Sequence, residues 1–267
     1  MLVVAAGPHV SVHEMARAAA PSVASAAQPN WQRRACAEFL GSALLAATVV
    51  GSGIAAARLS PTDVGLQLLE NALATTLGLF AIILMFAPVS GAHFNPVVSL
   101  VDAALGFRPW RDVGLYIPVQ VAGCIVGALL ANVMFALPAV SISSTERMTG
   151  PHFLAEIVAT AGLILIVFTL ARSGRSAMAP AAVGAYIGAA YFFTSSASFA
   201  NPAITVGRMF SDTFAGIAPG SAPGYILAQL IGGAIGLLVV KVLYPVAAPA
   251  SDSGRSSAAS HDVASSN

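Results

Sequence analysis

Six long apolar stretches dominate this sequence and limit what the chain can fold into. They run near residues 37–57, 65–87, 113–137, 153–171, 177–195 and 222–244. Each is long enough for a helix that crosses the hydrocarbon core of a bilayer, which is ~30 Å thick and needs about 20 residues. None shows the alternation of apolar and polar residues that is typical of membrane β-barrel strands. The sequence therefore predicts an all-α protein whose first partner is the lipid bilayer.

The charge content supports this environment and excludes several classes of function. Charged residues make up 9% of the 267 residues and the net charge is +1, whereas an ordinary soluble domain is about 25% charged. Such a chain lacks the basic surface that nucleic acids require, so no nucleic-acid partner is expected. Cys36 and Cys124 lie in apolar stretches and the five histidines are scattered. We therefore expect no disulfide framework, metal centre or cofactor, and no enzyme.

The two ends of the chain differ in composition from its middle. Residues 1–30 are rich in Ala, Ser and Pro, and residues 247–267 are rich in Ser and Ala. Segments of this composition cannot bury enough apolar surface to fold on their own. We expect two disordered tails flanking one membrane domain at residues 31–246.

The distribution of basic residues predicts the orientation in the membrane. Nine of the 12 Arg and Lys residues fall on the same side as the chain ends, and the exceptions are Arg58, Arg147 and Arg208. Because cytoplasmic loops carry the excess of Arg and Lys, both ends are expected in the cytoplasm. The predicted location is the inner (plasma) membrane, which the chain crosses several times.

An internal repeat further constrains the architecture. AEFLGS begins at Ala37 and AEIVAT at Ala155, while SGAHFNPVVSL follows the second apolar stretch and SASFANPAITV follows the fifth. The halves cover about 35–140 and 150–246, and three crossings separate equivalent points. Because three is odd, the second copy must be inverted in the membrane. Inverted repeats place a shared site near the bilayer midplane.

Each repeat contains an Asn-Pro pair in a segment too short to cross the membrane. Asparagine is a good N-cap residue and proline suits the first helical position. Half-helices that begin at Pro96 and Pro202 would direct their positive ends, about +0.5 charge each, at the membrane centre. Asn95 and Asn201 would then offer carboxamide N–H groups to a permeating oxygen, while the helix ends repel cations. A single Asn-Pro pair indicates a turn, but two in symmetric positions favour a pore.

These motifs resemble those of the major intrinsic proteins, which comprise the aquaporins and aquaglyceroporins. AEFLG, SGAHFNP and FANPA occur in the family's order over six spans, within roughly residues 35–245. The resemblance implies two inward-folded half-helices, a pore in each protomer and a homotetramer. The motif residues carried over to this chain are Asn95, Pro96, Val97, Asn201, Pro202 and Ala203.

The resemblance also implies a role for two glutamates and a function for the pore. Glu38 and Glu156 match buried glutamates that hold the two half-helix loops, although they could instead be caps at helix starts. The implied function is passive passage of water and small neutral solutes such as glycerol-like polyols. The alternative is a secondary transporter, which needs ion-coupling carboxylates near the midplane; the candidates are Glu38, Glu70 and Glu156.

Two positions depart from the family pattern. Val97 stands where alanine is usual, and Ile204 stands where water and glycerol channels normally carry the arginine of the outer constriction. The second motif also resembles a bacterial branch whose members often lie beside arsenic-resistance genes. Arsenite is therefore a candidate solute, because its undissociated form is a small, neutral, polyol-like molecule.

Counting from the two asparagines gives the other positions of the constriction. Twenty residues before Asn95 lies Thr75, and three residues before Asn201 lies Ser198. The position in the fifth span falls at Ala189, Ala190 or Tyr191, and anchoring on Gly184 favours Tyr191. A ring of Thr75, Tyr191, Ser198 and Ile204 is wider and less polar than one with an arginine, so it favours neutral solutes larger than water.

Two further residues are candidates for the ends of the pore. Arg208 lies four residues after Ile204 and could stand at the outer mouth as a displaced constriction charge, or it could pair with Asp212 and only brace the loop. His93 precedes Asn95 by two residues and resembles a histidine of the family's cytoplasmic vestibule. A histidine that serves only packing is the alternative.

Overall fold

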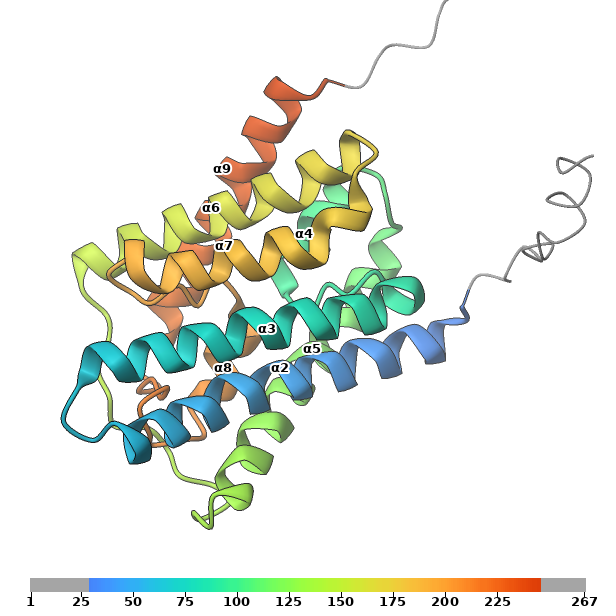
Figure 1. The fold of residues 1–267 in the computed structure, drawn as a ribbon. Coiled ribbons are helices and arrows are strands. Elements are labelled where there is room, and N and C mark those ends of the chain that lie inside the picture. Colours follow the sequence, from blue (N-terminus) through green and yellow to red (C-terminus); the bar gives the residue numbers. More distant parts are fainter. Residues whose placement is uncertain (1–28, 246–267) are drawn as a thin grey trace, which may run out of the picture.

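The computed structural model describes residues 29–245 and consists of helices and their connections. In chain order these are α2 (Trp31–Leu59), α3 (Val64–Ser90), α4 (Pro96–Ala104), α5 (Trp110–Met134), α6 (Gly150–Arg172), the 3-10 turn η1 (Ser176–Met178), α7 (Ala179–Phe193), α8 (Pro202–Arg208) and α9 (Ala222–Leu243) (Figure 1). Six of them, with η1 and α7 counted as one, are long and apolar enough to cross a membrane. The predicted six-span architecture with two short helices at Pro96 and Pro202 is confirmed. The tails expected at 1–30 and 247–267 lie outside the described residues, apart from positions 29 and 30.

Several spans begin earlier than the apolar pattern predicts. α2 starts at Trp31 rather than Ala37, because the Asn30 side chain accepts a hydrogen bond from the Arg33 backbone and caps a polar first turn. α6 likewise starts at Gly150, where Thr149 is the cap. Glu38 and Glu156 therefore lie well inside their helices. The reading of these glutamates as caps at helix starts is wrong.

The two repeats pack against each other in a symmetric way. α2 contacts α3 and α5 in the first repeat, and α6 contacts α7 and α9 in the second. Between the repeats, α3 contacts α7, α4 contacts α9, and α8 contacts α5. Each short helix is thus packed against the last long helix of the other repeat. Both ends of the described chain leave the bundle on the same side, which we call the terminal face (Figure 1).

Small residues let these helices approach closely. The glycines spaced four apart in α5, Gly123 and Gly127, lie against the backbone of α2, and a methyl group at Gly127 would overlap the carbonyl oxygen of Ala43. Gly232 and Gly236 of α9 meet α6 in the same manner. Packing of this kind drives helix association in lipid, where water exclusion contributes little. The helices of each pair are therefore tightly packed along these glycines.

Gly127→Ala is predicted to destabilise the protein by about 1–3 kcal/mol, because the added methyl must push α2 and α5 apart. Gly114→Ala in the same helix is the matched control, since nothing lies within 4 Å of the position its methyl would take. The measurement is the fraction of detergent-purified protein that stays folded after heating. Equal losses for the two variants would show that the α2–α5 contact is not as close as described.

Candidate functional site

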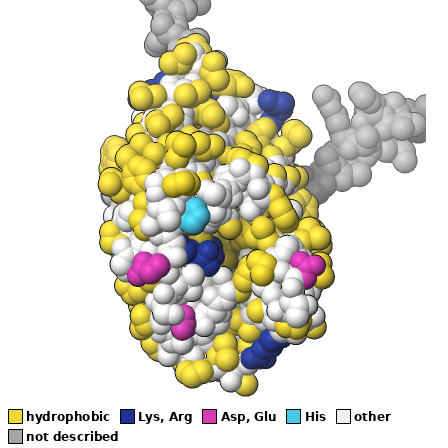
Figure 2. All heavy atoms as spheres, turned by 90° about the vertical axis from the view of Figure 1, so that its left-hand side faces the viewer, with side chains coloured by type: hydrophobic (Ala, Val, Ile, Leu, Met, Phe, Trp, Pro, Cys, Tyr) yellow, Lys and Arg dark blue, Asp and Glu magenta, His cyan; other side chains and the backbone are white. Residues whose placement is uncertain are grey.

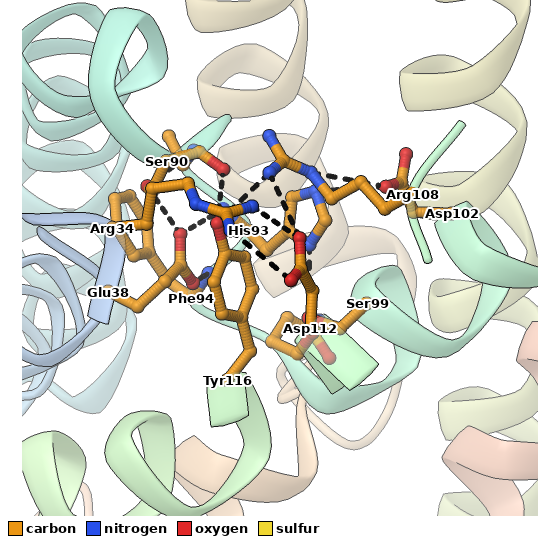
Figure 3. Close-up of polar contacts among 12 residues, drawn as sticks. Arg34, Glu38, Ser90, His93, Phe94, Ser99, Asp102, Arg108, Asp112 and Tyr116 are labelled. Atoms are coloured by element: carbon orange, nitrogen blue, oxygen red, sulfur yellow. Dashed lines mark hydrogen bonds and ion pairs between the residues drawn. The ribbon is translucent and has the colours of Figure 1, made fainter. Parts of the chain in front are cut away.

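The loop that leads into α4 is held by one buried carboxylate. Glu38 of α2 accepts hydrogen bonds from the Ser90 hydroxyl at 2.6 Å, the His93 backbone at 3.0 Å, the Phe94 backbone at 2.7 Å and the Gln120 side chain at 2.8 Å (Figure 3). The residue is 0% exposed. Four donors replace the water that the buried charge has lost.

The second repeat reproduces this arrangement around Glu156 of α6. Its carboxylate accepts from the Ser196 hydroxyl at 2.6 Å, the Phe199 backbone at 2.9 Å, the Ala200 backbone at 2.8 Å and the Gln229 side chain at 2.7 Å. The donor types match those of the first repeat, and the serine and the two backbone donors lie at the same positions relative to each asparagine. The inverted symmetry therefore extends to individual hydrogen bonds.

Both loops contain residues in the left-handed region of backbone conformation. Ala92 and Phe94 have φ of 53° and 49°, and the equivalent Ser198 and Ala200 have φ of 46° and 50°. Such a conformation costs a non-glycine residue of order 1–3 kcal/mol. The hydrogen bonds to Glu38 and Glu156 bind the backbone N–H groups of these same turns. The carboxylates thus hold two loops in a shape that the chain would not adopt alone.

Each strained loop delivers an asparagine to the start of a short helix. Asn95 is the N-cap residue of α4, where its side-chain oxygen accepts from the Val97 backbone at 2.9 Å. Asn201 is the N-cap residue of α8 and accepts from the Ala203 backbone at 2.9 Å. Pro96 and Pro202 occupy the first helical positions.

The two asparagines are joined to each other's loop. The carboxamide of Asn95 donates to the carbonyl of Ala200 at 2.7 Å, and the carboxamide of Asn201 donates to the carbonyl of Phe94 at 2.8 Å. The two helix N-termini therefore meet at one place. Each carboxamide has a second N–H, which has no hydrogen-bond partner among residues 29–245.

Val97, the first departure from the family pattern, has a partner that sequence reasoning missed. Its side chain is buried, and a methyl group at Gly233 of α9 would overlap it. The larger side chain at the start of α4 is thus accommodated by a glycine in the other repeat.

One cavity of about 810 Å³ passes the asparagines and reaches toward both ends of the bundle. Near the terminal face its lining includes Arg34, Asp102, Arg108 and Asp112, and at the other end it includes Arg208. Much of the wall between them is apolar, and among its residues are Leu45, Val49, Leu79, Ile83, Val98, Leu163, Val183 and Ile187. A neutral solute could pass along such a wall, because only a few polar groups are needed to replace its hydrogen bonds with water.

The four residues predicted for the constriction all line this cavity and are all buried. The hydroxyl oxygens of Thr75 and Tyr191 lie 3.1 Å apart, within hydrogen-bond distance. Ser198 and Ile204 come from the loop before α8 and from α8 itself. Of the two alternatives in the fifth span, Ala189 is exposed on the outside of the helix, and Ala190 is buried but is not among the residues that line the cavity.

Arg208 does not pair with Asp212, so that reading is wrong. Its guanidinium carbon lies 3.4 Å from the centroid of the Phe199 ring, and its Nε donates to the carbonyl of Ala215. Asp212 instead accepts from the backbone and hydroxyl of Ser144. The pairing fails because α8 ends at Arg208, so Asp212 is not one helical turn further on.

A second arginine lies near Arg208, and sequence reasoning did not find it. Arg147 donates to the carbonyls of Phe214 and Gly216 at 2.8 and 2.5 Å, and it lies 5.7 Å from the Phe199 ring centroid. Burial lowers the pKa of the Arg147 guanidinium. Figure 2 shows the face opposite the terminal face, where basic side-chain atoms lie near the centre beside a hollow.

His93 lies at the terminal-face side of Asn95 and lines the cavity. Its Nδ1 is 3.0 Å from the Ser99 hydroxyl, and its Nε2 is 3.6 Å from a carboxylate oxygen of Asp102. Its ring packs edge-on against Tyr116. The charged residues around it were missed, because their contacts depend on how the loop after α4 folds back.

The described part of the chain holds no group of three or more His, Cys, Asp or Glu side chains that could bind a metal ion. Cys36 and Cys124 are both free thiols, the first exposed and the second buried.

Comparisons with known proteins agree with this geometry. A profile of the family described as Major intrinsic protein matches residues 25–200. The chain is 46% identical over 218 residues to aquaglyceroporin AqpS of Rhizobium meliloti (strain 1021), covering 81% of this chain and 92% of that protein. It is 28% identical over 271 residues to the glycerol uptake facilitator protein of Pseudomonas aeruginosa, covering 85% and 95%. The fold matches the X-ray structure of the Plasmodium falciparum aquaglyceroporin with a TM-score of 0.64 at 22% identity, covering 81% of this chain and 98% of that one.

Glu38→Gln is predicted to lower both the stability and the yield of folded protein. One carboxylate oxygen accepts two hydrogen bonds and the other accepts two more. A carboxamide NH2 on either side would face two donors, which costs at least about 2–4 kcal/mol. Glu70→Gln is the matched control, because that residue, near the start of α3, accepts from Ser60 through a single oxygen. Equal thermal stability of the two variants would contradict the role assigned to Glu38.

Proposed function

The chain belongs to the major intrinsic protein family, and we propose that residues 31–246 form a channel through which water and small neutral solutes cross a membrane passively. The observation that carries this proposal is the meeting of two helix N-termini inside one cavity, each capped by an asparagine that hydrogen-bonds to the opposite loop. A solute passing Asn95 and Asn201 exchanges hydrogen bonds with water for hydrogen bonds with the free carboxamide N–H groups.

The same arrangement is proposed to exclude ions. The N-terminus of a helix carries a partial positive charge of about 0.5, so α4 and α8 together oppose a cation at the point where they meet. Fixed N–H donors also orient a water molecule there, which interrupts a chain of waters that could conduct protons. Neutral molecules meet neither barrier.

We propose that Thr75, Tyr191, Ser198 and Ile204 form the outer constriction. The proposal is supported by their burial, by their place in the cavity lining and by the contact between the Thr75 and Tyr191 hydroxyls. The isoleucine side chain is smaller than that of arginine and has no hydrogen-bond donor. At Ile204 a water molecule therefore finds no donor to replace its hydrogen bonds with bulk water, while a larger solute gains room. Glycerol-like polyols and metalloid hydroxides such as arsenite are therefore the proposed solutes.

Arg208 is proposed to supply the mouth of the constriction with the donors that Ile204 lacks. Its position over Phe199 and its bond to the Ala215 carbonyl engage only part of the guanidinium. The residue is 4% exposed and lines the cavity. The remaining N–H groups of the Arg208 guanidinium can donate hydrogen bonds to a solute before the solute enters the constriction. His93 is proposed as the corresponding vestibule residue on the other side of Asn95.

A secondary transporter is less well supported than a channel. Glu38 and Glu156 are saturated by four donors each, and Glu70 is not among the residues that line the cavity. Asp102 and Asp112 do line its terminal-face end, and both contact arginines. Flux that does not depend on a proton gradient would favour the channel. The proposal includes no enzymatic activity and no cofactor.

The chain is a multi-pass membrane protein, and we propose that it lies in the inner membrane with both ends in the cytoplasm. The excess of Arg and Lys on the side of the chain ends supports this orientation. We further propose a homotetramer. It is supported by apolar stripes on the outside of the bundle, such as exposed Leu69, Leu73 and Leu77 of α3, which lipid or a second copy could cover.

Stopped-flow light scattering of proteoliposomes tests the function directly. Wild-type protein is expected to accelerate the flux of glycerol and arsenite, measured in the same preparation as water. Ile204→Arg should cut solute flux at least about threefold and leave water flux equal or higher, because the new side chain fills the ring and restores donors. Ile204→Leu keeps the volume and is the control.

The double variant Ile204→Arg with Arg208→Ala separates the new arginine from repulsion by Arg208. If both arginine-containing variants pass glycerol and arsenite as fast as wild type, position 204 does not line the constriction. No acceleration of any solute by wild-type protein would contradict the channel itself.

Ionic conductance provides an independent prediction. Planar bilayers containing wild-type protein are expected to show no cation or proton current above that of empty bilayers, although position 204 lacks an arginine. The reason is that the helix ends at Asn95 and Asn201 still oppose positive charge. Currents that scale with the amount of protein would count against this mechanism.

A further inference from the structure

The two short helices carry ionisable residues at equivalent positions, seven residues after each asparagine. In α4 this residue is Asp102, and in α8 it is Arg208. They are 8% and 4% exposed, respectively, and both line the cavity. Because the repeats are inverted, they lie toward opposite ends of it. The inverted symmetry therefore points to Asp102 as the counterpart of Arg208 at the terminal face.

Asp102 is in an unusual position for a carboxylate. Its Oδ2 lies 3.3 Å from Arg108 Nε and 3.6 Å from His93 Nε2. Neither contact has hydrogen-bond geometry, and this buried oxygen accepts no hydrogen bond from residues 29–245. The side chain keeps 11% of its surface exposed. Burying a carboxylate that receives so few hydrogen bonds from the protein costs free energy, unless a donor from outside the protein binds to it.

Arg108 is held in place beside this carboxylate. Its Nη1 donates to the Tyr116 hydroxyl at 3.1 Å and lies 3.9 Å from Asp112, which also pairs with Arg34 (Figure 3). A side chain at Gly91, where φ is 91°, would come within 2.5 Å of Nη2. Nη2 makes no hydrogen bond within the described part of the chain, so the guanidinium keeps donors free at the mouth of the cavity.

We propose that Asp102 and Arg108 form a solute-binding site at the terminal-face entrance of the pore, specific for neutral molecules with two or more hydroxyl groups. A hydroxyl of such a solute donates to Oδ1 of Asp102, the carboxylate oxygen that is neither buried nor hydrogen-bonded within residues 29–245, while another accepts from Arg108. The site rests on the proposed channel function, and it adds a second specificity-determining position to the outer constriction.

The charges explain why the site suits neutral solutes. A cation approaching Asp102 also meets Arg108, and an anion approaching Arg108 meets Asp102, so neither gains a net attraction. A polyol satisfies both partners at once. It is then released toward apolar residues such as Ile83 and Val167, which hold it weakly. Conduction requires binding that is favourable enough for entrance and weak enough for exit.

The test compares wild type, Asp102→Leu and Asp102→Asn in proteoliposomes, with glycerol and water permeability measured in one preparation. Asp102→Leu removes the acceptor and is expected to lower the glycerol-to-water permeability ratio about three- to tenfold, the effect of one hydrogen bond of ordinary strength. Asp102→Asn keeps an oxygen acceptor and should give a smaller decrease. Asp63→Asn is the matched control, because this exposed residue caps α3, and asparagine caps equally well.

The outcomes separate this site from the channel itself. If wild type accelerates neither glycerol nor water, the channel function fails and the site fails with it. If wild type conducts but both Asp102 variants keep the wild-type ratio, or lose glycerol and water flux by the same factor, Asp102 has only a structural role and the proposal is overturned. Should Asp102→Leu fail to fold, a decreased ratio in Asp102→Asn alone supports the site and an unchanged ratio refutes it.

Discussion

The placement of the two short helices depends on two buried carboxylates that each accept hydrogen bonds from four donors. Glu38 and Glu156 accept from a hydroxyl, two backbone N–H groups and a glutamine, in the same pattern in both repeats. A charged side chain inside a membrane is energetically costly, so hydrogen-bond donors held in fixed positions by the protein must replace its water. The carboxylates therefore fix the loops, and the loops can keep left-handed residues that would otherwise relax.

Because the two loops are held in place, the asparagines at their ends meet at the centre of the molecule. The asparagines at their ends cap α4 and α8, and each also donates to the loop of the other repeat. The half-helices are thereby locked tip to tip inside the cavity. Position is fixed here by hydrogen bonds, while the long helices around them are held by close contacts at small residues.

The sequence predicted the elements more reliably than the contacts between them. Apolar length located six spans, and the paired Asn-Pro motifs located the half-helices, because both signals are local. Helix starts were missed where a polar first turn capped by Asn30 precedes the apolar residues. The Arg208–Asp212 pairing was wrong because α8 is shorter than the i to i+4 rule assumes. Contacts such as Val97 with Gly233 join distant parts of the chain, and no periodicity could indicate them.

The central claim is that solutes pass through the helical bundle of a single chain, past α8 and the residues beside it. Thiol modification tests it most directly, in a background with Cys36→Ser and Cys124→Ala. Ile204→Cys lines the cavity, whereas Ala189→Cys lies on the exposed side of α7. A small membrane-impermeant methanethiosulfonate reagent is predicted to block glycerol and water flux through Ile204→Cys and to leave Ala189→Cys unaffected. Full labelling of Ile204→Cys without any loss of flux would contradict the account.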